Sequence, residues 1–205
     1  MHIGLDFDNT IVSYDDLFHM VAMDEGLIPE DIPRSKVSIR NYLRRINKED
    51  AWTQMQGMVY GHRMSEASVY PGVIDSLKWA RKYGIKLSIV SHKTKYPFLG
   101  PQYDLHEAAL EWIKCNLNDQ NQPLITSENI FFELTKELKV ARISRVGCSF
   151  FIDDLPEIFE NSEFPLQVKK ILFDPDNHHY SQDFIRLNKW PELPGILGGL
   201  LPWKG

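Results

Sequence analysis

The chain has 205 residues, a formal net charge of −5 and a hydrophobic content of 43%, which suit one substantial core with room for an inserted subdomain. No apolar run approaches the roughly 18 residues of a membrane span, and the acidic balance argues against nucleic acid as the main partner. Two scattered cysteines are too few for a disulfide framework, and no basic region precedes an apolar stretch at the N-terminus, so we expect a cytoplasmic protein without a secretory signal or membrane segment.

The first ten residues, MHIGLDFDNT, contain a strand pattern that ends in two acids. Ile3, Leu5 and Phe7 alternate with smaller or polar positions, which is typical of a short strand. Asp6 and Asp8 lie at its carboxyl end, two residues apart. Carboxylates this close raise each other's pKa unless a cation or a proton lies between them. The pair therefore indicates a cation site if a second acidic cluster follows a later strand.

A helical pattern occupies the next fifty residues. The predicted helices cover 15–23, 38–46 with Ser38 as N-cap, and 49–58. Pro29 and Pro33 separate the first two helices, and the turn residues Tyr70-Pro71-Gly72 close the segment. We interpret residues 14–68 as a small helical domain inserted into a core formed by 1–13 and 69–205.

From residue 73 onward, helices alternate with short apolar strands. The expected elements are a helix over 73–83 ended by Gly84, a strand over 85–90, a helix over 104–117 capped by Asp104, a strand over 129–132, a helix over 135–146 capped by Thr135, a strand over 149–152, a short helix near Pro156 and a last strand over 168–173. This alternation predicts an α/β fold with a doubly wound parallel sheet. The tail from 190 to 205, rich in proline and glycine, is predicted to run over the surface.

Two later strands also end in residues that carry chemistry. The strand over 85–90 is followed by Ser91 and His92, and the strand over 149–152 is followed by Asp153 and Asp154. In an open parallel sheet, ligands bind outside the carboxyl ends of the strands, so these residues should meet the first acid pair at one edge. Such an oxygen-rich set is what Mg²⁺ prefers. The sequence therefore predicts a magnesium site there.

Four short motifs lie at the ends of the predicted strands and helices. They are Asp6-x-Asp8-x-Thr10, Ser91, a lysine at 136 or 139, and Asp153-Asp154. In this order they resemble the four motifs of the haloacid dehalogenase (HAD) superfamily, and the resemblance spans nearly the whole chain. It implies a Rossmann-like core with a helical cap at 14–68 and the activity of a Mg²⁺-dependent phosphoric monoester hydrolase. The second aspartate argues against dehalogenation, because that branch of the superfamily lacks it.

The resemblance implies a role for each of these residues. Asp6 would be the nucleophile that forms an aspartyl-phosphate, and Asp8 the general acid and base. Ser91 would donate a hydrogen bond to a phosphoryl oxygen. Mg²⁺ would be held by Asp6, by the backbone carbonyl of Asp8 and by Asp153 or Asp154. Asp154 is favoured, because the second acid of such a pair tends to take the metal in relatives, and Asp153 would then orient a water or the lysine.

Two phosphate-binding positions rest on weaker signals. Lys139 is favoured over Lys136 as the motif lysine, because its Lys-x-x-x-Ile spacing and its distance to Asp153 resemble the family better. The other lysine would then be a solvated helix residue. His92, beside Ser91, is a candidate contact to the substrate phosphate.

The expected substrate is a small phosphorylated metabolite, because a cap that closes over the site excludes water and bulky substrates. The loop from Ser91 to Pro97 and the Phe-Ile-Asp-Asp-Leu-Pro-Glu stretch resemble a branch of HAD-like hydrolases that points to sugar or surface-polysaccharide precursors. A 5'-nucleotidase-like enzyme is an alternative, with Tyr14, Phe18, Tyr42 or Trp52 as a stacking surface for a base. A non-catalytic protein that binds a phosphorylated ligand is a further alternative. A phosphorylated receiver domain fits poorly, because its acceptor aspartate follows a middle strand that here ends in Ser91.

Overall fold

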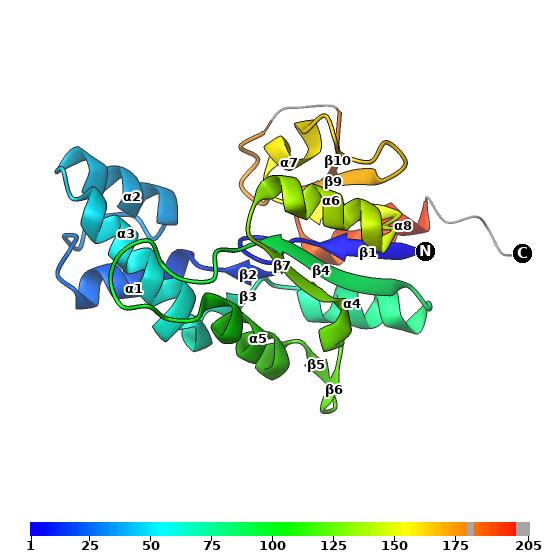
Figure 1. The fold of residues 1–205 in the computed structure, drawn as a ribbon, viewed down its shortest axis with the longest axis horizontal. Helices are drawn as coiled ribbons and strands as arrows, with labels where there is room; N and C mark the ends of the chain where they lie inside the picture. The colour runs from blue at the N-terminus through cyan, green and yellow to red at the C-terminus, as the bar shows by residue number, and fades with distance from the viewer. Residues whose placement is uncertain (180–182, 200–205) are drawn as a thin grey trace, which may run out of the picture. The chain divides into compact units, whose positions relative to one another are not determined.

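The computed structural model describes residues 1–179 and 183–199, and these residues form two compact units (Figure 1). The first, which we call the core unit, contains Met1–Ile11, Val69–His92 and the described residues from Leu117 onward. The second, which we call the helical unit, contains Val12–Ser68 and Lys93–Asn116. The assignment of 14–68 as a cap over a substrate stays a prediction.

The core unit is built on a six-stranded sheet in the order β10-β9-β8-β1-β4-β7. The strands are β1 (His2–Leu5), β4 (Lys86–His92), β7 (Ile130–Glu133), β8 (Phe150–Asp153), β9 (Lys169–Phe173) and β10 (Ile185–Leu187). All neighbouring strands of this sheet run parallel. The predicted α/β class with a parallel sheet is therefore confirmed.

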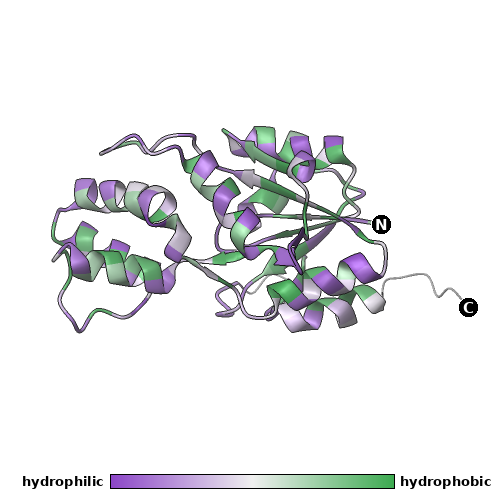
Figure 2. Ribbon diagram, turned by 90° about the horizontal axis from the view of Figure 1, so that it is seen from below, coloured by the Kyte–Doolittle hydropathy of each residue, from purple (hydrophilic) through white to green (hydrophobic). Residues whose placement is uncertain are grey.

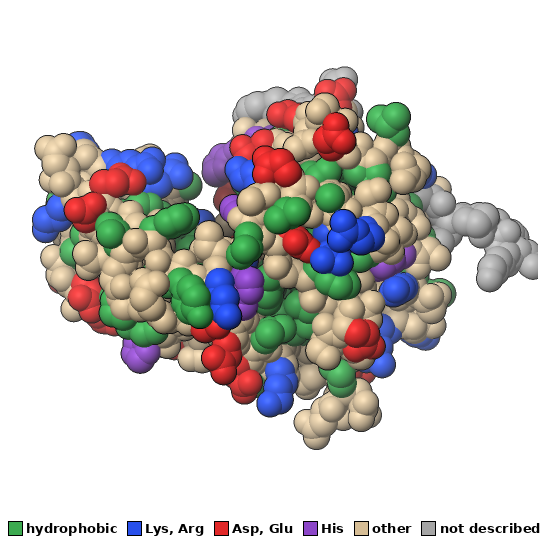
Figure 3. Space-filling model, in the orientation of Figure 1, with side chains coloured by type: hydrophobic (Ala, Val, Ile, Leu, Met, Phe, Trp, Pro, Cys, Tyr) green, Lys and Arg blue, Asp and Glu red, His purple; other side chains and the backbone are tan. Residues whose placement is uncertain are grey.

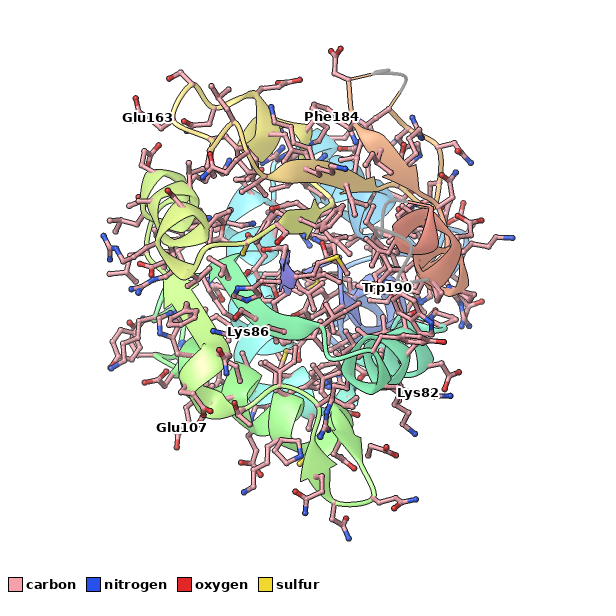
Figure 4. All side chains as sticks on the ribbon, turned by 90° about the vertical axis from the view of Figure 1, so that its right-hand side faces the viewer. Lys82, Lys86, Glu107, Glu163, Phe184 and Trp190 are labelled. Atoms are coloured by element: carbon pink, nitrogen blue, oxygen red, sulfur yellow. The ribbon has the colours of Figure 1, made fainter. Side chains whose placement is uncertain are left out.

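Helices cover both faces of the sheet, as the end-on view in Figure 4 shows. The core-unit helices are α4 (Val73–Lys82), α6 (Lys136–Val146), α7 (Pro156–Glu160) and α8 (Leu193–Gly198), with short 3-10 turns η3 (Ser127–Asn129) and η4 (Trp190–Glu192) and a two-stranded hairpin of β5 (Asn118–Asp119) and β6 (Gln122–Pro123). Helices α6 and α7 lie on one face, and α4 and α8 lie on the other (Figures 1 and 4). The doubly wound arrangement is what a parallel sheet requires, because both of its faces are apolar.

The face of the sheet under α6 and α7 packs closely around β1. Phe151, Leu172, Val140 and Ile158 belong to one buried cluster on this face. Gly4 of β1 lies so close to it that a Cβ atom would come within 2.5 Å of the Phe151 ring. A side chain at position 4 would therefore displace the Phe151 ring of the neighbouring strand β8, which ends at Asp153.

Local signals placed most helix ends correctly. Thr135 caps α6 by accepting a hydrogen bond from the Leu138 backbone N–H (3.2 Å), and Asp104 does the same for α5 (Leu105–Asn116) with the N–H groups of His106 and Glu107. Gly84 follows α4 with a positive φ of 66°, as a helix-terminating glycine does.

The predicted N-cap at Ser38 is wrong. The N-cap is Ser35, three residues earlier, so the helix begins at Lys36, and the side chain of Ser35 accepts the hydrogen bond from the Ser38 N–H. Both serines satisfy the local capping preference, so the choice between them depends on where the helix can begin. Asp15 contributes to that choice, because its carboxylate accepts a hydrogen bond from the Lys36 backbone N–H (2.7 Å).

Two predictions for the C-terminal part of the chain are also wrong. The strand over 168–173 is not the last one, because β10 pairs beside β9. The tail does not simply cover the surface: Trp190 is 1% exposed, and its indole N–H donates to the Thr10 carbonyl (3.0 Å). Ser76 of α4 in turn donates to the Trp190 carbonyl (2.8 Å). Burial of a large indole with satisfied hydrogen bonds outweighs the local preference of proline and glycine for loops. Positions 200–205 lie outside the described residues.

The helical unit has its own aromatic core. It contains α1 (Asp15–Asp24), α2 (Lys36–Arg45), α3 (Glu49–Gly57), a π-helical turn η1 (Met58–His62), a 3-10 turn η2 (Met64–Glu66) and α5 (Leu105–Asn116), while the short strands β2 (Val12–Ser13) and β3 (Ser68–Val69) flank its first segment. Phe18 stacks on Trp52 (5.0 Å between ring centroids), and Tyr14 meets Tyr60 edge-on (4.9 Å). Tyr14, Phe18 and Trp52 are all buried, so these three rings serve as core packing.

Hydropathy agrees with burial in both units. Figure 2 shows helices on which green and purple stretches alternate, as expected when one side of each helix is buried. Among the described residues, none of the helices combines the length and apolar character that a membrane crossing would need.

Candidate active site

The first acid pair lies in a sharp turn directly after β1. The Asp6 backbone N–H donates to the Ile152 carbonyl of β8 (2.8 Å), so Asp6 still follows the sheet. The chain then turns, with Ile11 N–H donating to the Phe7 carbonyl (3.0 Å) and Asn9 in the left-handed region at φ 58°. Asparagine tolerates that conformation better than most side chains. The turn brings Asp6 and Asp8 to the wall of the same pocket.

The Asp6 carboxylate is held by two donors from different elements. The Ser91 hydroxyl of β4 donates to Asp6 Oδ1 at 2.8 Å, and the Lys139 ammonium of α6 lies 2.6 Å from the same oxygen. All three side chains are buried. Strand β4 pairs directly with β1, so the serine at its end reaches Asp6 as the parallel topology predicts. The predicted strand over 85–90 was too short, because Ser91 and His92 are the last two residues of β4.

Lys139 also binds the second acid pair. Its ammonium lies 2.6 Å from Asp153 Oδ2, while Asp153 Oδ1 accepts a hydrogen bond from the Leu155 N–H (3.0 Å). Burial alone would lower the pKa of Lys139, but the carboxylates of Asp153 and Asp6 raise that pKa above its ordinary value. Burial raises the pKa of the Asp153 carboxyl, and the Lys139 charge opposes that rise. The lysine is therefore a charged link between two buried acids.

Asp154 has a different environment from Asp153. It is only partly buried, and its Oδ1 accepts a hydrogen bond from the Thr10 hydroxyl (3.2 Å). Asp154 lines the pocket, whereas Asp153 is not among the lining residues. The two acids that the sequence left as alternatives for a metal thus face different partners.

The predicted site residues meet around one small pocket of the core unit. Its volume is about 70 Å³, and it is lined by Asp6, Asp8, Asn9, Ser91, His92, Lys136, Lys139, Asp154, Leu155 and Ile158. Sequence analysis did not single out Asn9, Leu155 or Ile158. Asn9 lies inside the first motif, so its position there was an available signal. Lys136, the alternative to Lys139 as the motif lysine, also lines the pocket, since positions three apart share one face of a helix.

The two remaining nitrogen groups of the wall, those of His92 and Lys136, have different surroundings. Burial lowers the pKa of His92, assisted by the nearby positive charges of Lys139 and Lys136, so the ring is neutral at neutral pH. Lys136 forms an ion pair with Glu157 of α7. It is therefore not simply a solvated helix residue, as the sequence had suggested for the second lysine.

Carboxylates dominate the site and fit a hard cation. Carboxylate oxygens of Asp6, Asp153 and Asp154 lie within 4.8 Å of one another, and Asp8, which lines the pocket, is a fourth acid of the site. Lys139 balances only part of this charge. An oxygen-only donor set with surplus negative charge suits Mg²⁺ better than a softer metal.

Neither a protein-family model nor a curated protein matches the sequence. Several solved structures match over nearly the whole chain. A HAD-superfamily hydrolase from Ehrlichia chaffeensis is 15% identical with a TM-score of 0.57, covering 98% of this chain and 97% of its own. The putative HAD-hydrolase YfnB from Bacillus subtilis, bound to magnesium, is 14% identical with a TM-score of 0.60, covering 96% of this chain and 97% of its own.

A HAD family hydrolase from Deinococcus radiodurans, with bound phosphate and sodium, is 14% identical with a TM-score of 0.55. The match covers 98% of this chain and 96% of that one. These likenesses show that the chain has the fold of HAD hydrolases, as the motifs implied. At such identities they establish the fold, and the activity has to be argued from the site.

Proposed function

We propose that the protein is a Mg²⁺-dependent phosphatase that hydrolyses a small phosphorylated metabolite through an aspartyl-phosphate intermediate. The observation that carries this proposal is the Asp6 carboxylate, held by Ser91 and Lys139 on the wall of a pocket that also contains Asp8. The magnesium of the Bacillus subtilis structure and the phosphate of the Deinococcus radiodurans structure, both with this fold, support it.

Asp154 is the better candidate for the metal within the second acid pair. Both oxygens of Asp153 are already engaged, one by Lys139 and one by the Leu155 N–H. Asp154 lines the pocket, so we assign Mg²⁺ to Asp6, Asp154 and the backbone carbonyl of Asp8. When bound there, Mg²⁺ would neutralise phosphoryl oxygens that otherwise repel a nucleophile. Asp153 acts through Lys139, whose ammonium it positions against Asp6.

In the first half of the reaction, the Asp6 carboxylate attacks phosphorus and the bond between phosphorus and the ester oxygen breaks. Asp8 donates its proton to that oxygen, which leaves as an alcohol. In the second half, Asp8 takes a proton from a water that attacks phosphorus, and the bond to Asp6 breaks to release inorganic phosphate. Ser91 and Lys139, both against Asp6 Oδ1, lie where they stabilise negative charge on the transferred group.

The test is phosphate release from a panel of phosphorylated metabolites in the presence of Mg²⁺. Asp6→Asn should release none above background, and Asp8→Asn should be slower by about 10²–10⁴-fold, the usual contribution of general acid–base catalysis. Asp75→Asn, at an exposed position of α4, is the matched control and should behave as wild type. Wild type that releases no more phosphate than Asp6→Asn on any substrate would refute the proposal.

The metal is tested in the same assay. EDTA should abolish phosphate release and added Mg²⁺ should restore it, since the acid cluster would otherwise repel the anionic substrate. Activity that survives EDTA unchanged would contradict the metal assignment while leaving the nucleophile in place.

A further inference from the structure

A second lysine lies on the wall of the pocket, and the mechanism above does not use it. Lys136 and Lys139 both belong to α6 and both line the pocket. Positions three apart share one face of a helix, so both side chains start from the same face. The Lys139 side chain is 1% exposed, whereas that of Lys136 is 43% exposed. Lys139 therefore belongs to the buried end of the pocket and Lys136 to its solvent side.

The ammonium of Lys136 has an exchangeable partner. It pairs with Glu157, in the first turn of α7, whose side chain is 55% exposed. Ion pairs this exposed contribute little to stability, so an anion that enters the pocket can displace the glutamate. Figure 3 shows acidic side chains gathered over α7. Lys136 supplies a positive charge between that acidic surface and the acids of the pocket.

We propose that Lys136 binds a second anionic group of the substrate, a carboxylate or a second phosphate, and that this group displaces Glu157 from the Lys136 ammonium when substrate binds. This inference rests on the proposed function, because it takes Asp6 and Lys139 as the place of the reacting phosphoryl group. Three residues, a rise of about 4.5 Å, separate the two lysines along α6. The second anionic group should therefore lie a few bonds from the phosphate.

The neighbouring His92 is the other nitrogen group that could bind the second anion. It lines the same pocket, and burial lowers its pKa, which disfavours the charged ring. Among the described residues that line the pocket, positive charge on the solvent side comes from Lys136. A substrate with one phosphate and no second anion would leave the pair between Lys136 and Glu157 intact and gain nothing from it.

The test uses ligands that cannot be hydrolysed, so that binding is measured separately from turnover. Phosphonoacetate carries a carboxylate where ethylphosphonate carries a methyl group, and 1,2-ethylenediphosphonate carries a second phosphonate. Dissociation constants would be measured by calorimetry with saturating Mg²⁺. Wild type should bind at least one of the two doubly anionic ligands about tenfold more tightly than ethylphosphonate, the effect of one charge-assisted hydrogen bond. Which of the two is preferred identifies the second group.

Three variants assign the preference to this lysine. Lys136→Gln should reduce it to less than about threefold while changing ethylphosphonate binding little. Glu157→Gln should increase it, because the lysine loses its competing partner. Lys78→Gln is the matched control, since Lys78 has a similar exposed ion pair with Asp119 (3.0 Å) outside the residues that line the pocket.

Four outcomes would overturn the inference. They are no preference in wild type, equal weakening of all ligands by Lys136→Gln, an unchanged preference in that variant, and no binding of any ligand. The binding result is independent of catalysis. A preference for doubly anionic ligands without phosphate release from any substrate would refute the proposed phosphatase activity and support the anion site at Lys136. Phosphate release without that preference would support the phosphatase activity and refute the anion site.

Discussion

Two buried aspartates at the carboxyl ends of neighbouring strands differ in whether their cationic partner also contacts a residue of the pocket. Asp153 ends β8 and pairs with Lys139, which also contacts Asp6. Asp174 follows β9 and pairs with Arg186 of β10. Both acids are at most 3% exposed, so each needs a partner to offset the loss of hydration. The partners differ in what else they contact.

The Asp174 site has a structural role. Its carboxylate accepts hydrogen bonds from the N–H groups of His178 and His179 (2.9 Å each) and pairs with Arg186, which attaches β10 to the loop after β9. Burial alone would raise the pKa of Asp174, but these donors lower it. Neither Asp174 nor Arg186 belongs to the residues that line the pocket. A buried acid after a strand therefore does not by itself indicate catalysis: what distinguishes Asp153 is a lysine shared with a residue of the pocket.

The largest expected effect comes from breaking the shared lysine. Lys139→Met leaves the buried acids without their cation, so the free energy of unfolding should fall by about 3–5 kcal/mol. Phosphate release should also be lost, because the positive charge against Asp6 disappears. Urea unfolding and the phosphate assay check the two effects. A variant as active as wild type would show that the Lys139 site is no more important for activity than the Asp174 site.

Breaking the Asp174 pair should affect stability alone. Arg186→Met should lower the free energy of unfolding by about 1–3 kcal/mol, less than Lys139→Met, because the two backbone donors still satisfy the carboxylate. The folded fraction should keep wild-type kcat, since the pair does not line the pocket. A kcat reduced tenfold or more in fully folded protein would show that the Asp174 site and the pocket are coupled.

The smallest effect is expected at the amino end of the same sheet, where a buried histidine has a neutral partner. His2 Nε2 lies 2.8 Å from the Ser88 hydroxyl, and burial lowers the pKa of His2. Between this lowered value and the unfolded value of about 6.5, the unfolded state binds more protons, so stability falls as pH falls through that window. His2→Gln should make this dependence shallower in urea unfolding between about pH 7.5 and 5.5. An equal pH dependence in the variant and wild type would assign the effect to other groups.

Elements that depend on nearby residues were predictable. Thr135 and Asp104 cap their helices because a side-chain oxygen three or fewer residues away is enough to satisfy an N–H group. Strand β10 was not predictable in the same way. Three residues carry no measurable periodicity, and the ion pair between Arg186 and Asp174 that accompanies its pairing with β9 joins residues twelve apart.

By itself, the sequence determined that Asp6, Ser91 and Asp153 would meet, because the carboxyl ends of parallel strands share one edge of a sheet. The resemblance to the family favoured Lys139 over Lys136, and the tertiary structure decided that Lys139 joins these residues. Lys136 and Lys139 share a helix face, so helix geometry alone does not separate them. The packing of α6 on the sheet directs Lys139 to the buried acids and leaves Lys136 beside Glu157. The physical reason is that a buried carboxylate must be paired with a cation. Which lysine comes close enough to pair with it depends on how the helix packs on the sheet.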